Sequence, residues 1–291
     1  MVLKPLLSTL LIVLLSCCQF FLAEPAQAVS DFWQRSLPFP VKPQRIVSLS
    51  PATTEILYAV GAGAQVVGVT STCNYPPQVL QKPRLGMFGT VPMEALLKLR
   101  PDLIVVTTDM QKVLAPLQRL PIPVLALDSR SLVRLWQNVE TVANLTGHRA
   151  QGRLLSMQMQ SQFKALRARI PARHQVPGVF YLVWDQPLIA AGSASFIGDV
   201  LRLSGARNLV PDATQPFPHV SLEYLLKSDP EVLILPESLA SRIQLNRSPF
   251  NRLQAVQGHR VLRLPDDLIS RPAPRILQAM SQIIDFLHRK G

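Results

Sequence analysis

The chain has 291 residues, of which 48% are hydrophobic and 16% are charged. This balance supports packed cores and excludes a disordered protein, and the length suits two domains of about 120 residues. The net charge is +12, but Lys and Arg are spread along the chain without a basic run. We therefore expect no nucleic-acid partner, and an anionic membrane surface or ligand is easier to accommodate.

Residues 1–28 are typical of an export signal, with one Lys, a long apolar run and the sequence AQA ending at Ala28. We expect cleavage after Ala28 and release into the periplasm. The sequence LLSC, ending at Cys17, also fits a lipoprotein box, so a lipid-anchored protein is the alternative. Cleavage after Ala28 would leave Cys73 as the only cysteine, which rules out an internal disulfide. No later segment is apolar enough for a membrane-spanning helix.

Strands and helices alternate from residue 45 onward. We predict strands at 45–49, 65–70, 103–107, 123–128, 178–183 and 260–265. We predict helices from 51 to about 60, at 93–99, 111–119 and 131–145, and from about 274 to 289. The strands are nearly all apolar, which is typical of a parallel sheet covered on both faces. Ser50 can cap the first helix, and Gly61 ends it.

A long helical pattern covers 148–171 and has apolar residues spaced for one face. About 20 residues at 1.5 Å each span roughly 30 Å, the width of a domain. Gly152 weakens the helical propensity slightly. We predict that this helix links an N-terminal lobe, 45–147, to a C-terminal lobe, 176–291.

The two predicted lobes repeat the same phrases. MEALLKLRPDLIVV at 93–106 is echoed by LEYLLKSDPEVLIL at 222–235, so that Glu94 corresponds to Glu223 at an offset of 129 (223 − 94). Around the first helix of each lobe the offset is 144, and Glu55 corresponds to Asp199. The period is too long for a solenoid. The sequence therefore predicts an α/β fold of two similar lobes, each with a parallel sheet flanked by helices.

From Arg45 to its end the chain resembles the class III substrate-binding proteins of ABC transporters, in particular the family that binds cobalamin and iron chelates. The resemblance is carried by RIVSLSPATTEILYAVGAGAQVVGVTSTCNYPP, PMEALLKLRPDLIVV, PFPHVSLEYLLKSDPEVLIL and ISRPAPRILQAM. It implies a ligand between two lobes bridged by a rigid helix, and delivery to an ABC permease dimer with its ATPase. We expect a monomer that captures cobalamin or a related corrinoid, with haem or a ferric siderophore as the alternative ligand.

The resemblance also implies roles for particular residues. It places seven residues at or beside the cleft: Thr72, Phe88, Thr107, Trp184, Phe217, Asp267 and Arg271. The last two would hydrogen-bond amides on a corrin rim, or Arg271 would grip a carboxylate; a structural ion pair is the alternative. The family has tryptophans where Phe88 and Phe217 stand, and a tyrosine where Thr72 stands, which leaves the ligand open.

Glu94 and Glu223 stand where the family has one carboxylate per lobe that docks into arginine pockets of the permease. The alternative is that each simply favours a helix N-terminus. The five histidines are scattered, so we expect no bound metal ion. A chelatase-like enzyme and a binding protein without a transport role remain as alternatives. We expect no catalytic residue and no cofactor, since the chain lacks known catalytic motifs and nothing near Cys73 would lower its pKa.

Overall fold

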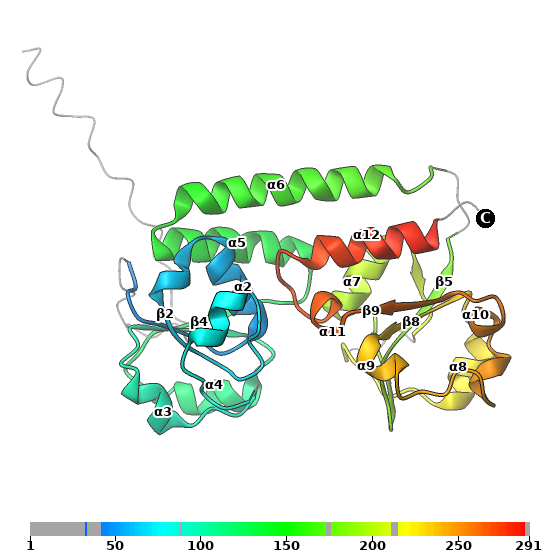
Figure 1. Ribbon diagram of the computed structural model, residues 1–291, viewed down its shortest axis with the longest axis horizontal. Coiled ribbons are helices and arrows are strands. Elements are labelled where there is room, and N and C mark those ends of the chain that lie inside the picture. The colour runs from blue at the N-terminus through cyan, green and yellow to red at the C-terminus, as the bar shows by residue number, and fades with distance from the viewer. Residues whose placement is uncertain (1–32, 34–41, 88, 173–175, 211–214, 289–291) are drawn as a thin grey trace, which may run out of the picture. The chain divides into compact units, whose positions relative to one another are not determined.

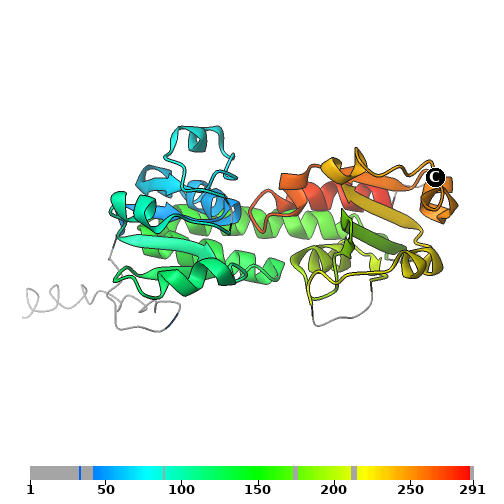
Figure 2. The same cartoon turned by 90° about the horizontal axis from the view of Figure 1, so that it is seen from below.

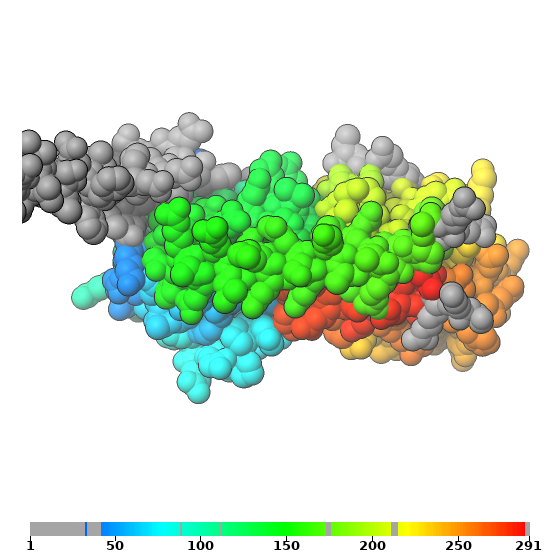
Figure 3. All heavy atoms as spheres, turned by 90° about the horizontal axis from the view of Figure 1, so that it is seen from above, coloured from blue at the N-terminus to red at the C-terminus, as the bar shows by residue number. Residues whose placement is uncertain are grey.

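The computed structural model describes residue 33 and residues 42–87, 89–172, 176–210 and 215–288. The predicted export signal lies outside these ranges. Residues 31–291 form one compact unit, which contains two separate sheets (Figure 1). Helix α6 (Arg149–Ala168) extends along both halves of this unit, and the space-filling view in Figure 3 shows it lying across them. The predicted fold of two α/β lobes joined by one long helix is confirmed.

The N-terminal lobe is built on a parallel sheet of four strands in the order β2-β1-β3-β4. The strands are β1 (Ile46–Ser48), β2 (Val66–Val69), β3 (Leu103–Thr107) and β4 (Val124–Leu127). The helices are α2 (Pro51–Ala59), α3 (Met93–Lys98), α4 (Gln111–Leu117) and α5 (Leu132–Thr146), with 3-10 turns η1 (Ala62–Gln65) and η2 (Pro77–Gln81). Nearly every strand residue is buried, because helices cover both faces of the sheet.

The C-terminal lobe repeats this arrangement and adds an edge strand and short helices. Its strands are β5 (Gly178–Asp185), β6 (Leu188–Ala190), β7 (Arg207–Asn208), β8 (Val232–Pro236) and β9 (Val261–Leu264). Its helices are α7 (Phe196–Leu203), α8 (Leu222–Ser228), α9 (Glu237–Ala240), α10 (Gln254–Gln257), α11 (Asp266–Ile269) and α12 (Ile276–Leu287), with the 3-10 turn η3 (Phe250–Arg252). The sheet is parallel except for β6, an antiparallel edge strand that the sequence pattern does not predict.

The internal repeat reappears in the structure (Figure 2). Shifting β3 by 129 residues gives the bounds of β8, and shifting the start of α5 by 144 gives the start of α12 (132 + 144 = 276). Equivalent helices also begin in the same way. Ser50 and Ser195 cap α2 and α7, each accepting a hydrogen bond from the backbone N–H three residues later. The two lobes are therefore copies of one design.

Helix α6 is fastened to both lobes. On the N-terminal side it packs against α5, and a Cβ atom at Gly152 would lie only 2.1 Å from the Cβ of Ala143. Gly152 is thus required for the close approach of the two helices, at the cost of some helical propensity. On the other side Arg169, just after α6, pairs with Asp285 and donates to the Ser281 hydroxyl of α12. No helix within the described ranges is long and apolar enough to cross a bilayer.

Candidate functional site

The predicted ligand residues follow the carboxyl ends of strands, where open α/β sheets place their ligands. Thr107 ends β3 and is buried, and Thr72 follows β2. Trp184 stands next to last in β5, and its side chain is 43% exposed. Asp267 lies in α11, directly after β9. Phe88 lies outside the described residues.

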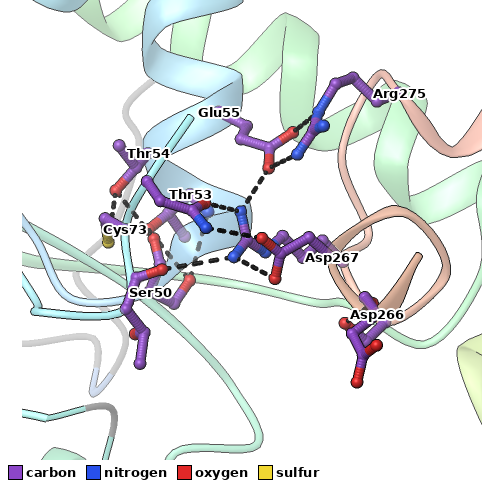
Figure 4. A network of polar contacts seen from close by, with 12 residues as sticks. Ser50, Thr53, Thr54, Glu55, Cys73, Asp266, Asp267 and Arg275 are labelled. Atoms are coloured by element: carbon purple, nitrogen blue, oxygen red, sulfur yellow. Dashed lines mark hydrogen bonds and ion pairs between the residues drawn. The ribbon is translucent and has the colours of Figure 1, made fainter. Parts of the chain in front are cut away.

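Arg271 contacts two other predicted ligand residues, Asp267 and Thr72, and so forms a cluster with them. Figure 4 shows Asp267 and Glu55 at two sides of this network of polar contacts. The guanidinium of Arg271 pairs with Asp267 at 2.5 Å and donates to the backbone oxygen of Thr72 at 3.3 Å. It also donates to Oδ1 of Asn74 at 2.7 Å and to Oε1 of Glu55 at 3.0 Å. Since Arg271 and Asp267 belong to the C-terminal lobe and the other partners to the N-terminal lobe, the cluster crosses between the lobes.

The two charged groups of this cluster differ in exposure. The side chain of Arg271 is 9% exposed and faces acceptors of the protein itself. The side chain of Asp267 is 42% exposed, although Asn74 also donates to it at 2.7 Å. The exposed charged group of this cluster is therefore the carboxylate of Asp267, and binding of an anion by Arg271 would require its contacts within the protein to break.

Sequence reasoning gave no site role to Glu55, Asn74 or Arg275. Arg275 binds both carboxylate oxygens of Glu55, at 2.8 and 2.7 Å, and stacks over the ring of Tyr75 at 3.7 Å. The hydrogen bond to Glu55 raises the pKa of Arg275 above its usual value. Two signals in the sequence could have indicated this pair. Arg275 follows Arg271 by four residues, and the position of Glu55 is also acidic in the second copy of the repeat, where Asp199 stands.

A second group surrounds Trp184. The Arg242 guanidinium lies 4.2 Å from the indole centroid and pairs with Asp185 at 3.3 Å. The indole N–H donates to the backbone oxygen of Gln186 at 3.0 Å, which fixes the rotation of the ring. Because Arg242 covers one face of the indole, the other face is left for a flat apolar partner.

The edge strand β6 brings Phe217 to this group. Ile189 in β6 pairs with Trp184 on one side and bridges to His219 on the other. Phe217 is 46% exposed and lies in the bend that precedes His219 by two residues. No contact among the described residues joins Trp184 or Phe217 to the Arg271 cluster, so the predicted set forms two groups.

A pocket of about 790 Å³ opens on the other side of Glu55. Tyr58, Tyr75, Lys82 and Arg275 line it together with residues of η1. None of the six predicted ligand residues that the structure describes is among its lining residues. Burial raises the pKa of Tyr58. The exposed indole of Trp184 and carboxylate of Asp267 lie outside this pocket, at the strand ends.

The two predicted docking carboxylates, Glu94 and Glu223, lie in the first turns of α3 and α8 and are exposed. Figure 1 shows both helices at the edge of the molecule away from α6. Glu94 pairs with exposed Lys98 at 2.9 Å. An exposed pair of this kind contributes about 0 to 1 kcal/mol, so Glu94 adds little to the stability of its lobe through Lys98.

Cys73 is buried between the hydroxyls of Thr54 and Thr70, at 3.2 and 3.1 Å. These neutral partners place it in the packing of the N-terminal lobe. The described part of the chain contains no group of three His, Cys, Asp or Glu side chains that could hold a metal ion.

Residues 46–268 match the protein family described as periplasmic binding proteins. The chain belongs to the periplasmic binding protein family. As a periplasmic binding protein it binds a small solute and is not an enzyme. Along its sequence it is 29% identical over 280 residues to a vitamin B12-binding protein of Vibrio cholerae, covering 96% of this chain and 98% of that one.

Solved structures of periplasmic binding proteins share the fold. The periplasmic vitamin B12 binding protein of Vibrio cholerae is 30% identical with a TM-score of 0.79, over 85% of this chain and 98% of that one. A periplasmic haem binding protein of Pseudomonas aeruginosa is 25% identical with a TM-score of 0.77, over 86% and 94% of the two chains.

Proposed function

We propose that this periplasmic binding protein captures cobalamin or a related corrinoid between its lobes and delivers it to an ABC permease. The observation that carries the proposal is the exposed carboxylate of Asp267 beside the sequestered Arg271. Corrins carry a rim of neutral amides, and a carboxylate can accept hydrogen bonds from the N–H groups of these amides. Haem carries carboxylates, which Asp267 would repel.

The aromatic group supports the same class of ligand. Trp184 near the end of β5 and Phe217 are both exposed, and β6 lies between β5 and the segment that contains Phe217. Such rings pack against the flat apolar faces of a macrocycle. They provide a large apolar contact area and need few hydrogen bonds to the ligand. Relatives named for vitamin B12 add weight to the corrinoid, while the haem-binding neighbour keeps haem as the second candidate.

The remaining parts of the proposal concern export and partners. The protein is exported, cleaved after Ala28 and released into the periplasm as a monomer; retention through a lipid on Cys17 is the alternative. It docks through Glu94 and Glu223 on a permease dimer powered by its ATPase. Two exposed carboxylates on equivalent helices suit a two-fold receptor, with which arginines can form bidentate pairs.

Calorimetric titration of the purified protein with cyanocobalamin, hemin and a ferric catecholate tests the ligand. We expect saturable binding of cobalamin at one per chain and weak binding of the two anionic ligands, since Asp267 faces the cleft. Saturable binding of hemin without binding of cobalamin would contradict the proposal. The Asp267→Asn variant should reduce the difference in affinity between cobalamin and hemin, because it removes the negative charge that repels the carboxylates of hemin.

Arg242 is expected to tune this affinity. The Arg242→Gln variant loses the cation on the indole, so we expect cobalamin affinity to fall roughly 2- to 5-fold, the effect of about 0.5 to 1 kcal/mol. The emission spectrum of Trp184 should shift at the same time, because its neighbouring charge disappears. Arg252→Gln, an exposed change in the same lobe, serves as the control. An equal loss of cobalamin affinity in both variants would show that the position of Arg242 over the indole of Trp184 does not affect binding.

A further inference from the structure

The carboxylate of Glu55 connects the two lobes at a buried point. Its side chain is 2% exposed and lies in α2 of the N-terminal lobe. It accepts hydrogen bonds from Arg271 and Arg275, which precede α12 in the C-terminal lobe more than 200 residues later. Figure 4 shows Glu55 pointing toward Arg275. Arg275 binds it with two nitrogens, the geometry that orients a guanidinium most strictly.

The other copy of the repeat makes the reciprocal contact. Asp199 in α7 of the C-terminal lobe accepts a hydrogen bond from the backbone N–H of Leu132 at 2.9 Å. Leu132 is the first residue of α5 in the N-terminal lobe, and the offset of 144 relates it to Ile276, which directly follows Arg275. In each lobe, therefore, an acidic residue of the first helix holds the beginning of the last helix of the opposite lobe.

The two contacts are unequal in strength. Glu55 has three charge-assisted hydrogen bonds in a buried site, where such bonds are strong and a lost partner is costly. Asp199 has one bond to a backbone N–H and a pair with exposed Arg202, so water competes with it. Stacking of Arg275 on Tyr75 of the N-terminal lobe adds to the stronger side.

The stronger contact also leads to the cleft. Arg271, held on one side by Glu55, pairs on its other side with Asp267, the exposed carboxylate of the ligand site. Asn74 connects the two, accepting from Arg271 and donating to Asp267. If Glu55 moved, Arg271 would lose one of its partners. The Asp267 side chain, which pairs with Arg271, would then no longer be held in one direction.

We propose that Glu55 and Asp199 form a reciprocal clamp that sets the separation of the lobes, and that Glu55 is the positioning residue for Asp267. The clamp itself follows from contacts within the chain. Its effect on ligand affinity rests on the proposed corrinoid function. Neither residue touches the ligand in this scheme, and each acts by holding the opposite lobe.

Hydrogen-exchange mass spectrometry of the full chain tests the clamp without a ligand. Glu55→Gln, which keeps the shape but removes the charge, should accelerate exchange at 270–276 and 72–75 and leave β1 and β8 unchanged. Asp199→Asn should give a smaller acceleration at the start of α5. The matched control is Asp102→Asn, because Asp102 accepts two backbone N–H bonds within the N-terminal lobe alone. Uniform acceleration across both sheets, or no change, would overturn the proposal.

Cobalamin affinity provides the second measurement. We expect Glu55→Gln to raise the Kd roughly tenfold, because the Asp267 carboxylate is no longer held in one direction, and Asp102→Asn to leave the Kd unchanged. Local acceleration of exchange with an unaltered Kd would overturn the positioning role. If the unmodified protein binds no cobalamin, the corrinoid proposal fails and the exchange data alone decide on the clamp. Should Glu55→Gln not fold, Arg275→Gln removes the same bidentate pair from a less buried side.

Discussion

Charge reversal at either docking carboxylate, Glu94→Lys or Glu223→Lys, is expected to reduce uptake to background while the Kd for the ligand stays unchanged. A lysine in place of the glutamate would face the permease arginines with like charge, which costs several kcal/mol at an interface. In the proposed site the ligand lies elsewhere, at the ends of the strands, so its Kd does not depend on these two carboxylates. Uptake of labelled cobalamin by cells and titration of the purified variants provide the two measurements.

Glu237→Lys is the matched control for this experiment. Glu237 is exposed in the first turn of α9, so its reversal disturbs a helix N-terminus in the same way without lying on α3 or α8. Normal uptake by Glu237→Lys would show that the loss of uptake in the Glu94 and Glu223 variants comes from lost docking and not from a positive charge at a helix N-terminus. An altered Kd in Glu94→Lys would speak against a pure docking role, and unimpaired uptake would remove the role altogether.

Truncation of the exposed indole, Trp184→Ala, is expected to weaken cobalamin binding by roughly 30-fold or more. An aromatic residue that anchors an interface typically contributes about 2 kcal/mol or more when truncated, which corresponds to that factor. Folding should be little affected, because the ring is 43% exposed in the free protein. Calorimetry gives the Kd, and thermal unfolding gives the stability.

A second tryptophan provides the control. Trp136 packs edge-on against Phe163, where α5 meets α6, with ring centroids 6.2 Å apart. Trp136→Phe should leave affinity unchanged and preserve the quenching of tryptophan fluorescence by cobalamin. Quenching that persists in Trp184→Ala and disappears in Trp136→Phe would place the ligand away from β5 and contradict the proposed site.

The order of strands and helices was predictable because its signals are local. Apolar runs marked β3 and β8, Ser50 and Gly61 marked the ends of α2, and the repeat gave the two lobes. Strand β6 was missed because three residues carry too little pattern, and only its pairing with β5 makes it a strand. The helix at 111–119 ends at Leu117, two residues earlier than predicted.

The site was predictable only where its partners are close in sequence. Asp267 and Arg271 are four residues apart, and their pairing is a local event. Glu55 and Arg275 are separated by 220 residues, and no periodicity or composition connects them. Glu55 also pairs with Arg271, 216 residues away, and this second long-range contact holds the Arg271 guanidinium inside the protein while Asp267 stays exposed.

The matched contacts of Glu55 and Asp199 give the molecule an approximate two-fold axis between its lobes. The same half-turn exchanges α3 with α8, and with them the carboxylates Glu94 and Glu223. A permease dimer has a two-fold axis of its own, so two docking orientations related by a half-turn present it with nearly the same charges. Orientation must then be chosen by the features that the duplication did not preserve, such as β6, which has no counterpart in the N-terminal sheet.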